Sequence, residues 1–317
     1  MHTIQLPSKL TERALETLMP MLNRANEEDE ILLDFGKVQF YYPTATVAIL
    51  ARCWHWKQEG KKLSATNHNH CPASNYLKRI DFFEELGLKL DEPFQRRSTN
   101  DRFVTVRRIR HGKDVDKIAR EVADCMASGA DDIQKVISYA VGEIINNVMQ
   151  HSGGEGFLAA QRYGNSVHFA VADSGMGLRR SFDGTKLEPE LTTPLLALQK
   201  SMEPFVSSAL LRPPTGPYNE YVNRGIGLSM VDELTRQTYG KMDVLTENAH
   251  FQRVGQISAE YREVDNLSNQ GVLVSMHINT DEIDNFQEII TNVRKIVHAE
   301  EADYTPNILD EWENMFK

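Results

Sequence analysis

The chain has 317 residues, 41% of them hydrophobic and 25% charged, which is the composition of an ordinary globular protein with room for two domains. Its formal net charge of -10 argues against a protein that coats nucleic acid, so no nucleic-acid partner is expected. No apolar run reaches membrane-spanning length, the first residues lack a signal-peptide pattern, and the 3 cysteines are widely spaced, so we expect a cytoplasmic location without membrane contact.

Residues 1–90 predict a first α/β domain. Apolar runs alternate with amphipathic stretches, in the rhythm of strand, turn, helix, glycine and strand that is typical of βαβ units. Pro43 suits the first turn of the second helix, Thr44 is a natural cap for it, and Gly60 ends it. The expected elements are strands at 3–6, 30–35 and 62–66, and helices at 11–23, 44–58 and 75–86.

The first domain resembles a known family of regulators. The segments 31–38, 42–45 and 60–63, with a helix between the last two, are similar in order to the STAS domain of anti-sigma-factor antagonists. In that family the turn before the helix commonly reads Asp-Ser-Ser-Gly, and a partner kinase phosphorylates one Ser. Here positions 42–45 read Tyr-Pro-Thr-Ala, and only Thr44 keeps a hydroxyl of that kind. The resemblance therefore leaves two roles open: phosphate acceptance at Thr44, or docking of the domain on another domain or protein, which we favour.

A polar stretch at 91–102 predicts a linker, and residues 103–280 predict a second domain. The second domain begins with a strand at 103–106 and an amphipathic helix at 114–128. The arginines that follow the strand are interpreted as a solvated strand end; they are Arg107, Arg108 and Arg110.

The next helix carries the most informative pattern. Apolar residues recur at helical spacing between residues 137 and 148, which predicts an amphipathic helix with one face in a core. Glu143, Asn147 and His151 are four residues apart and therefore share another face. A carboxylate, an amide and an imidazole on one stripe can hold a hydrated Mg²⁺ and orient a water molecule.

Two glycine motifs follow. After an apolar strand at 167–172, the stretch Asp173-Ser-Gly175-Met-Gly177 places an acid before glycines, which let backbone approach a ligand closely. The stretch 224–228, Arg-Gly-Ile-Gly-Leu, opens a second amphipathic helix. Exposed N–H groups at a helix start, assisted by the helix dipole, can bind phosphate.

Taken in order, ExxxN, DxGxG and GxGL resemble the histidine-kinase-like ATPase superfamily, also called GHKL, which includes anti-sigma-factor kinases. The resemblance covers residues 103–279 and implies ATP and Mg²⁺ as cofactors. It implies that Glu143 is the general base, that Asn147 binds Mg²⁺, and that Asp173 accepts a hydrogen bond from the adenine amino group.

The resemblance assigns the remaining candidates to the nucleotide site as well. Gly175 and Gly177 would shape the adenine pocket, while Gly225 and Gly227 would cradle the phosphates, next to Leu228. Two further candidates are left with alternatives: His151 either belongs to the site or only braces it, and Arg224 either contacts phosphate or is solvated.

The family often has Gly-Thr at the start of a late strand, where the Thr reaches adenine through water. Here the step reads Gly271-Val272, so that contact has no counterpart. The proline-rich segment 178–223, with a helix at 195–199, corresponds to the ATP lid. Late strands are expected at 240–245, 256–261 and 271–278, and a helical extension at 281–317.

The sequence thus predicts an α/β fold: an α+β sandwich of GHKL type behind an N-terminal STAS-like domain. We expect a regulator that uses Mg-ATP binding, with hydrolysis or protein phosphorylation as options, to switch an interaction with a protein partner. The alternative is a non-catalytic nucleotide-binding module that acts through its STAS-like domain. A homodimer is left open. We also expect a chain without residues 1–90 to keep ATP binding.

Overall fold

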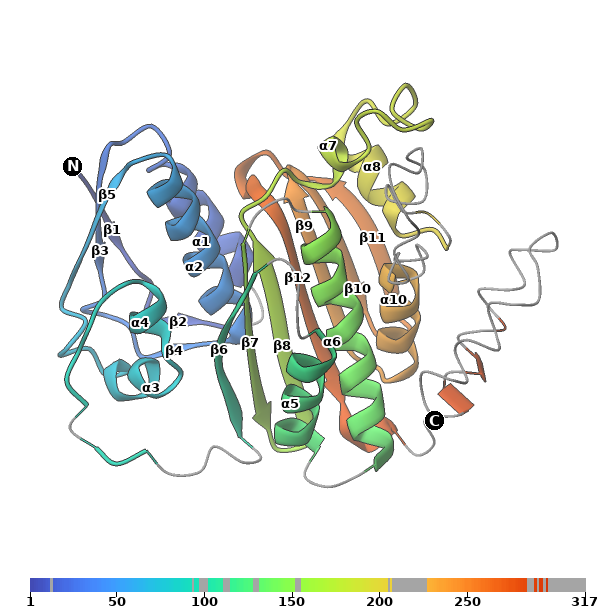
Figure 1. Ribbon diagram of the computed structural model, residues 1–317, viewed down its shortest axis with the longest axis horizontal. Helices are drawn as coiled ribbons and strands as arrows, with labels where there is room; N and C mark the ends of the chain where they lie inside the picture. Colours follow the sequence, from blue (N-terminus) through green and yellow to red (C-terminus); the bar gives the residue numbers. More distant parts are fainter. Residues whose placement is uncertain are drawn as a thin grey trace.

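The computed structural model describes residues 1–11, 14–92, 94–96, 102–110, 115–127, 131–151, 155–204, 206, 227–283, 288–289, 291–292 and 295. Within these ranges helices and sheets form a mixed α/β structure, which confirms the expected fold class at that level. A small sheet and a large sheet lie on opposite sides of a helical layer formed by α1 and α2 (Figure 1).

The small sheet has three parallel strands in the order β1-β3-β5. Parallel pairing follows from the helical crossovers that the sequence predicts between successive strands. A short parallel pair, β2-β4, lies beside it. The strands of this unit are β1 (His2–Gln5), β2 (Lys9–Leu10), β3 (Glu30–Asp34), β4 (Phe40–Tyr41) and β5 (Lys62–Thr66). Its helices are α1 (Ala14–Asn23), α2 (Pro43–Gln58), α3 (Ser74–Arg79) and α4 (Phe82–Glu85).

Two local expectations in this unit are wrong. The single helix expected at 75–86 is broken into α3 and α4, because Asp81 adopts a left-handed conformation with φ of 62°. Aspartate tolerates that region better than most residues. Thr44 is not the cap of α2: Tyr42 is the N-cap residue and makes no side-chain capping bond, whereas Pro43 does occupy the first turn.

The large sheet has seven strands in the order β11-β10-β9-β12-β8-β7-β6, and every neighbouring pair is antiparallel. Its strands are β6 (Phe103–Ile109), β7 (Gly156–Tyr163), β8 (Ser166–Asp173), β9 (Lys241–Glu247), β10 (Ala249–Val254), β11 (Ser258–Glu263) and β12 (Asn269–Asn279). The last strand in sequence therefore lies in the middle of the sheet, between β8 and β9.

Helices cover both faces of the large sheet (Figure 1). The helices of the second unit are α5 (Val115–Ala127), α6 (Asp131–His151), α7 (Leu178–Ser181), α8 (Pro194–Ser201) and α10 (Gly227–Gln237), with 3₁₀ turns η1 (Asp265–Leu267) and η2 (Thr280–Glu282). Side chains alternate along each strand, so Leu158 and Val171 join the core beneath α5, α6 and α10. Their neighbours Phe157 and Ala170 point the other way and join the core of the small-sheet unit.

Helix α2 is therefore buried between two sheets. Its residues from Ala45 to Cys53 are all buried, together with Trp56, and a helix that is buried around most of its circumference needs partners on more than one side. The small sheet covers one side. Phe157, Ala159, Ala170, Ala172, Leu245 and Leu273 of the large sheet share the core on the other.

Polar contacts also connect the two units. Arg108, which we expected to be solvated, lies over the Trp54 ring of α2 at 3.7 Å and forms an ion pair with Glu155. Within the expected linker at 91–102, Arg96 forms an ion pair with Asp81 at 2.6 Å. That part of the linker is thus attached to the small-sheet unit.

Among the helices in the described ranges, none has the length and apolar character needed to cross a membrane. The predicted C-terminal extension at 281–317 lies almost entirely outside those ranges.

Candidate functional site

The structure brings together two of the three predicted motifs, which lie far apart in the sequence. Glu143 and Asn147 lie one turn apart on α6, and Gly227 begins α10. A Cβ atom added to Gly227 would lie 2.5 Å from Glu143 Oε2 and 3.5 Å from Asn147 Nδ2. The start of α10 therefore lies directly against the polar face of α6, and a side chain at position 227 would collide with the carboxylate.

The apolar faces of α6 and α10 hold this arrangement in place. Ile144 of α6 and Val231 of α10 are buried in the same core. Tyr139 of α6 donates a hydrogen bond to Met230 Sδ of α10 at 3.2 Å. Leu228 is 7% exposed and belongs to this core, so its burial fixes where α10 begins.

Asp173 ends β8 and is 1% exposed. Its Oδ1 accepts a hydrogen bond from the backbone N–H of Gly175 at 2.7 Å, and its Oδ2 accepts one from the N–H of Val272 at 3.1 Å. The side chain of Gln270 donates to the carbonyl of Gly175 at 3.1 Å. The DxGxG turn is thus fixed from β12 as well as from its own backbone.

Gly271 is a site residue whose role the sequence analysis missed. It has a φ of 83°, and an added Cβ would lie 2.4 Å from both Asp173 Oδ1 and the Asp173 carbonyl oxygen. Only glycine allows β12 to approach the carboxylate this closely. The signal in the sequence was Gly271 itself, because a glycine within a strand often marks a close approach of another segment of backbone.

Gly177 is also required by its backbone conformation. Its φ is 81°, and it precedes α7 as the N-cap residue. The N–H of Leu178 donates to Thr246 Oγ1 at 3.0 Å, which attaches this turn to β9.

Strand pairing relates Asp173 to the end of α6. Gly156, which begins β7, pairs with Asp173 in the sheet, and α6 ends at His151. Five residues of extended chain reach at most about 18 Å, so the C-terminal end of α6 lies within about that distance of Gly156, the strand partner of Asp173.

Several residues predicted for the site lie outside the described part of the chain. Arg224 and Gly225 lie outside the described residues, as does the whole of the lid segment beyond residue 206. His151 ends α6, but its side chain lies outside the described part. Within that part, no group of three or more His, Cys, Asp or Glu residues is arranged to hold a metal ion.

Burial changes the acidity of both candidate carboxylates. It raises the pKa of Glu143 from 4.5 to about 7. It also raises the pKa of Asp173 from 3.8 to about 7, against the opposing effect of the N–H groups of Gly175 and Val272. Raised carboxyl pKa values of this size are typical of functional sites, where a buried acid meets a ligand.

These pKa values predict a pH dependence of stability. The folded protein retains both protons up to a pH near 7, whereas the unfolded chain releases them near the ordinary values. The folded state thus binds more protons in this window, and the contribution of the two groups to stability falls as pH rises from about 4 to 7. Urea unfolding at pH 5 and pH 8 should show a smaller decline in the double variant Glu143→Gln/Asp173→Asn than in the wild type. An equal decline in both proteins would contradict the raised pKa values.

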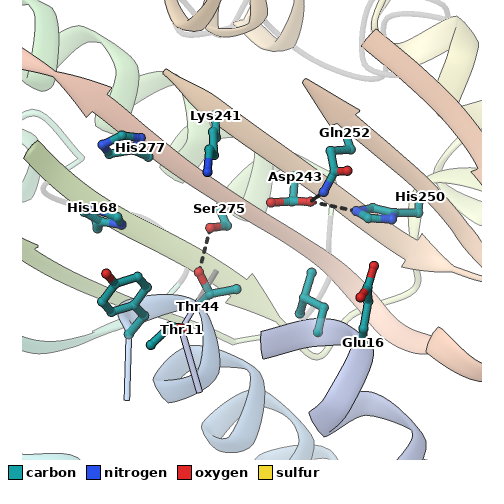
Figure 2. Close-up of a pocket in the computed structure, with 12 residues that line it drawn as sticks. Thr11, Glu16, Thr44, His168, Lys241, Asp243, His250, Gln252, Ser275 and His277 are labelled. Carbon is teal, nitrogen blue, oxygen red and sulfur yellow. Dashed lines mark hydrogen bonds and ion pairs between the residues drawn. The ribbon is translucent and has the colours of Figure 1, made fainter. Parts of the chain in front are cut away.

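A second polar cluster lies between the two units and was not predicted (Figure 2). Thr44 Oγ1 of α2 and Ser275 Oγ of β12 share a hydrogen bond of 2.6 Å. Asp243 accepts hydrogen bonds from His250 and from Gln252, each at 2.9 Å. The cluster lines a cavity that leaves about 50 Å³ of space for water-sized molecules. Its residues are Thr11, Leu15, Glu16, Tyr42, Thr44, His168, Lys241, Asp243, His250, Gln252, Ser275 and His277.

Comparisons with known proteins leave the family of the chain open. No protein-family model matches the sequence, and a search of curated proteins finds no significant match.

Proposed function

We propose that this protein is an ATP-binding regulator of the histidine-kinase-like ATPase type, in which Mg-ATP binding switches an interaction with a protein partner. The observation that carries the proposal is the close approach of the start of α10, at Gly227, to Glu143 and Asn147. This arrangement places the N-terminus of α10, whose N–H groups can bind phosphate, next to the carboxylate of Glu143 and the amide of Asn147, which can bind hydrated Mg²⁺. The buried Asp173, at the end of β8, supports the assignment of an adenine pocket.

The residues present fit such a ligand. Each oxygen of Asp173 accepts one backbone hydrogen bond, and a carboxylate oxygen has a second lone pair that can accept from an amino group. With glycine at position 227, the start of α10 can lie close to Glu143 without a clash. Asn147 supplies a carbonyl oxygen, the kind of ligand that Mg²⁺ prefers.

Each residue then has a distinct role. Bound Mg-ATP would supply an activated phosphoryl group. Asp173 selects adenine by accepting from its amino group, Asn147 binds the metal, and the N–H groups at the start of α10 bind phosphate oxygens. Glu143 in its deprotonated form accepts a proton from water or from a protein hydroxyl.

One observation favours the alternative of a nucleotide-binding module without turnover. A pKa of about 7 leaves a large fraction of Glu143 protonated at neutral pH, and in that form it cannot act as a base. Binding would then be the whole function, and the small-sheet unit would respond to it.

At pH 8, where Asp173 is mostly deprotonated, Asp173→Asn is expected to weaken ATP binding by about 1.5–3 kcal/mol, because an amide replaces the charged acceptor for the adenine amino group. Titration calorimetry with Mg-ATP measures the change. The matched control is Asp29→Asn, the same substitution at an exposed position before β3, which should bind like the wild type. Wild-type affinity in Asp173→Asn would remove the adenine assignment, and absence of ATP binding in the wild type would remove the proposed function.

A further inference from the structure

Strand β12 contacts the candidate nucleotide site directly. The N–H of Val272 donates to Asp173 Oδ2, and Gly271 lies so close to this carboxylate that no side chain fits. Gln270 holds the carbonyl of Gly175. Three successive residues of β12 therefore determine where the Asp173 carboxylate lies.

The same stretch of chain contacts α2 at two places, one on each side of Gly271. Ser275 shares its hydrogen bond with Thr44 at the start of α2 (Figure 2). The carbonyl of Ser268, immediately before β12, accepts from Arg52 Nη2 at 2.9 Å. Leu273, between these two contacts, is buried in the core that β12 shares with α2.

The contact of Arg52 with Ser268 is costly to break. Arg52 is 4% exposed, and burial lowers the pKa of its guanidinium to about 10. Its hydrogen bonds go to Asn26 Oδ1 at 2.8 Å and to the Ser268 carbonyl, and within the described ranges it forms no ion pair with an acid. Loss of either acceptor would leave part of a buried positive charge without a hydrogen bond, which is unfavourable. Arg52 therefore fixes the position of the Ser268 carbonyl.

We infer that Thr44 and Arg52 are positioning residues for Asp173: through β12, helix α2 sets the affinity and the base selectivity of the nucleotide site from the opposite face of the sheet. This inference rests on the proposed role of Asp173 in binding adenine. Thr44 would then act on the nucleotide site indirectly, through the hydrogen bond between its hydroxyl and that of Ser275.

The test compares Thr44→Val with Thr44→Ser by calorimetry, using Mg-ATP and Mg-inosine triphosphate. Inosine has a carbonyl where adenine has its amino group, so the ratio of the two affinities reports the position of Asp173. Thr44→Val removes the hydroxyl at nearly constant side-chain volume. We expect it to weaken ATP binding roughly 2- to 30-fold, which is the range of coupling energies carried through packed networks. It should also lower the ratio of ATP affinity to inosine triphosphate affinity. Thr44→Ser keeps the hydroxyl and should retain the wild-type ratio.

If Thr44 only stabilises the fold, Thr44→Val would lower the melting temperature and leave the ratio of ATP affinity to inosine triphosphate affinity unchanged. A wild-type ratio in folded Thr44→Val therefore overturns the inference while leaving the proposed function intact. Absence of ATP binding in the wild type overturns both.

A measurement on the wild type keeps the inference testable if Thr44→Val does not fold. Coupling between two sites is reciprocal, so Mg-ATP must also stabilise the contact between α2 and β12. Hydrogen exchange of the amides at 44–46 should slow when Mg-ATP is added, whereas the amides of β1, an edge strand of the small sheet, should be unaffected. Unchanged exchange at 44–46 under saturating ATP would contradict the coupling.

Discussion

A chain that lacks residues 1–90 is expected to lose its cooperative fold, contrary to the expectation from sequence that it keeps ATP binding. The deletion removes α1 and α2 and uncovers the apolar face of the large sheet. The exposed residues are Val106, Phe157, Ala159, Ala170, Ala172, Leu245 and Leu273. Exposing the four largest of these side chains costs roughly 6–12 kcal/mol, at about 1.5–3 kcal/mol each, which is as much as the whole stability of a typical domain.

The direct measurement is the solubility and thermal unfolding of the 91–317 chain. We expect aggregation and no cooperative transition. A soluble fragment that unfolds cooperatively and binds ATP would show that the two units are independent.

A cleavage experiment separates the effect of the interface from the effect of a shortened chain. A specific protease site is inserted at 97–100, and the purified full-length protein is cut after it has folded. The two fragments should co-elute in gel filtration, because the core around α2 and the contact between Arg108 and Trp54 persist without the covalent connection. Fragments that separate at micromolar concentration would contradict an obligate interface.

Glu143→Gln is expected to lower ATP turnover by about 10²- to 10⁴-fold, while ATP affinity stays within a few-fold of the wild type. The substitution keeps the shape of the side chain beside Gly227 and removes the proton acceptor. Steady-state phosphate release and transfer of label to protein measure turnover, and calorimetry measures affinity. The matched control, Glu260→Gln at an exposed position of β11, should have wild-type turnover.

The pH dependence of turnover provides an independent check on this role. Because the deprotonated carboxylate is the base and its pKa is about 7, turnover should rise as pH increases from 6 to 8, with its midpoint near 7. A flat profile, or equal turnover in Glu143→Gln and wild type, would rule out Glu143 as the base. A wild type that binds ATP without turnover would favour the non-catalytic module.

The pattern of apolar residues was sufficient to predict several elements. Helix α6 spans Asp131–His151 and contains the predicted apolar stretch, and β3 and β5 lie within the predicted strands. These predictions hold because a helix or strand that packs on a core buries one face, and apolar residues therefore repeat at helical or strand spacing. Strand β10, at Ala249–Val254, was missed because Arg253 ends the alternation of apolar and polar residues after four positions. Two of them, His250 and Gln252, bind Asp243 across the sheet.

By itself the sequence determined the mixed α/β character of the chain and the stripe that places Glu143 one turn before Asn147. Both are local: they depend on the spacing of residues within one element. The tertiary structure decided that Gly227 lies against that stripe, that β12 holds Asp173, and that α2 is covered by both sheets. These contacts depend on the order of strands in the sheet and on which apolar faces pack together. The spacing of residues within one segment does not specify the segment against which it packs. Thr44 illustrates the difference, since a residue suited to cap its own helix instead hydrogen-bonds Ser275 of the neighbouring sheet.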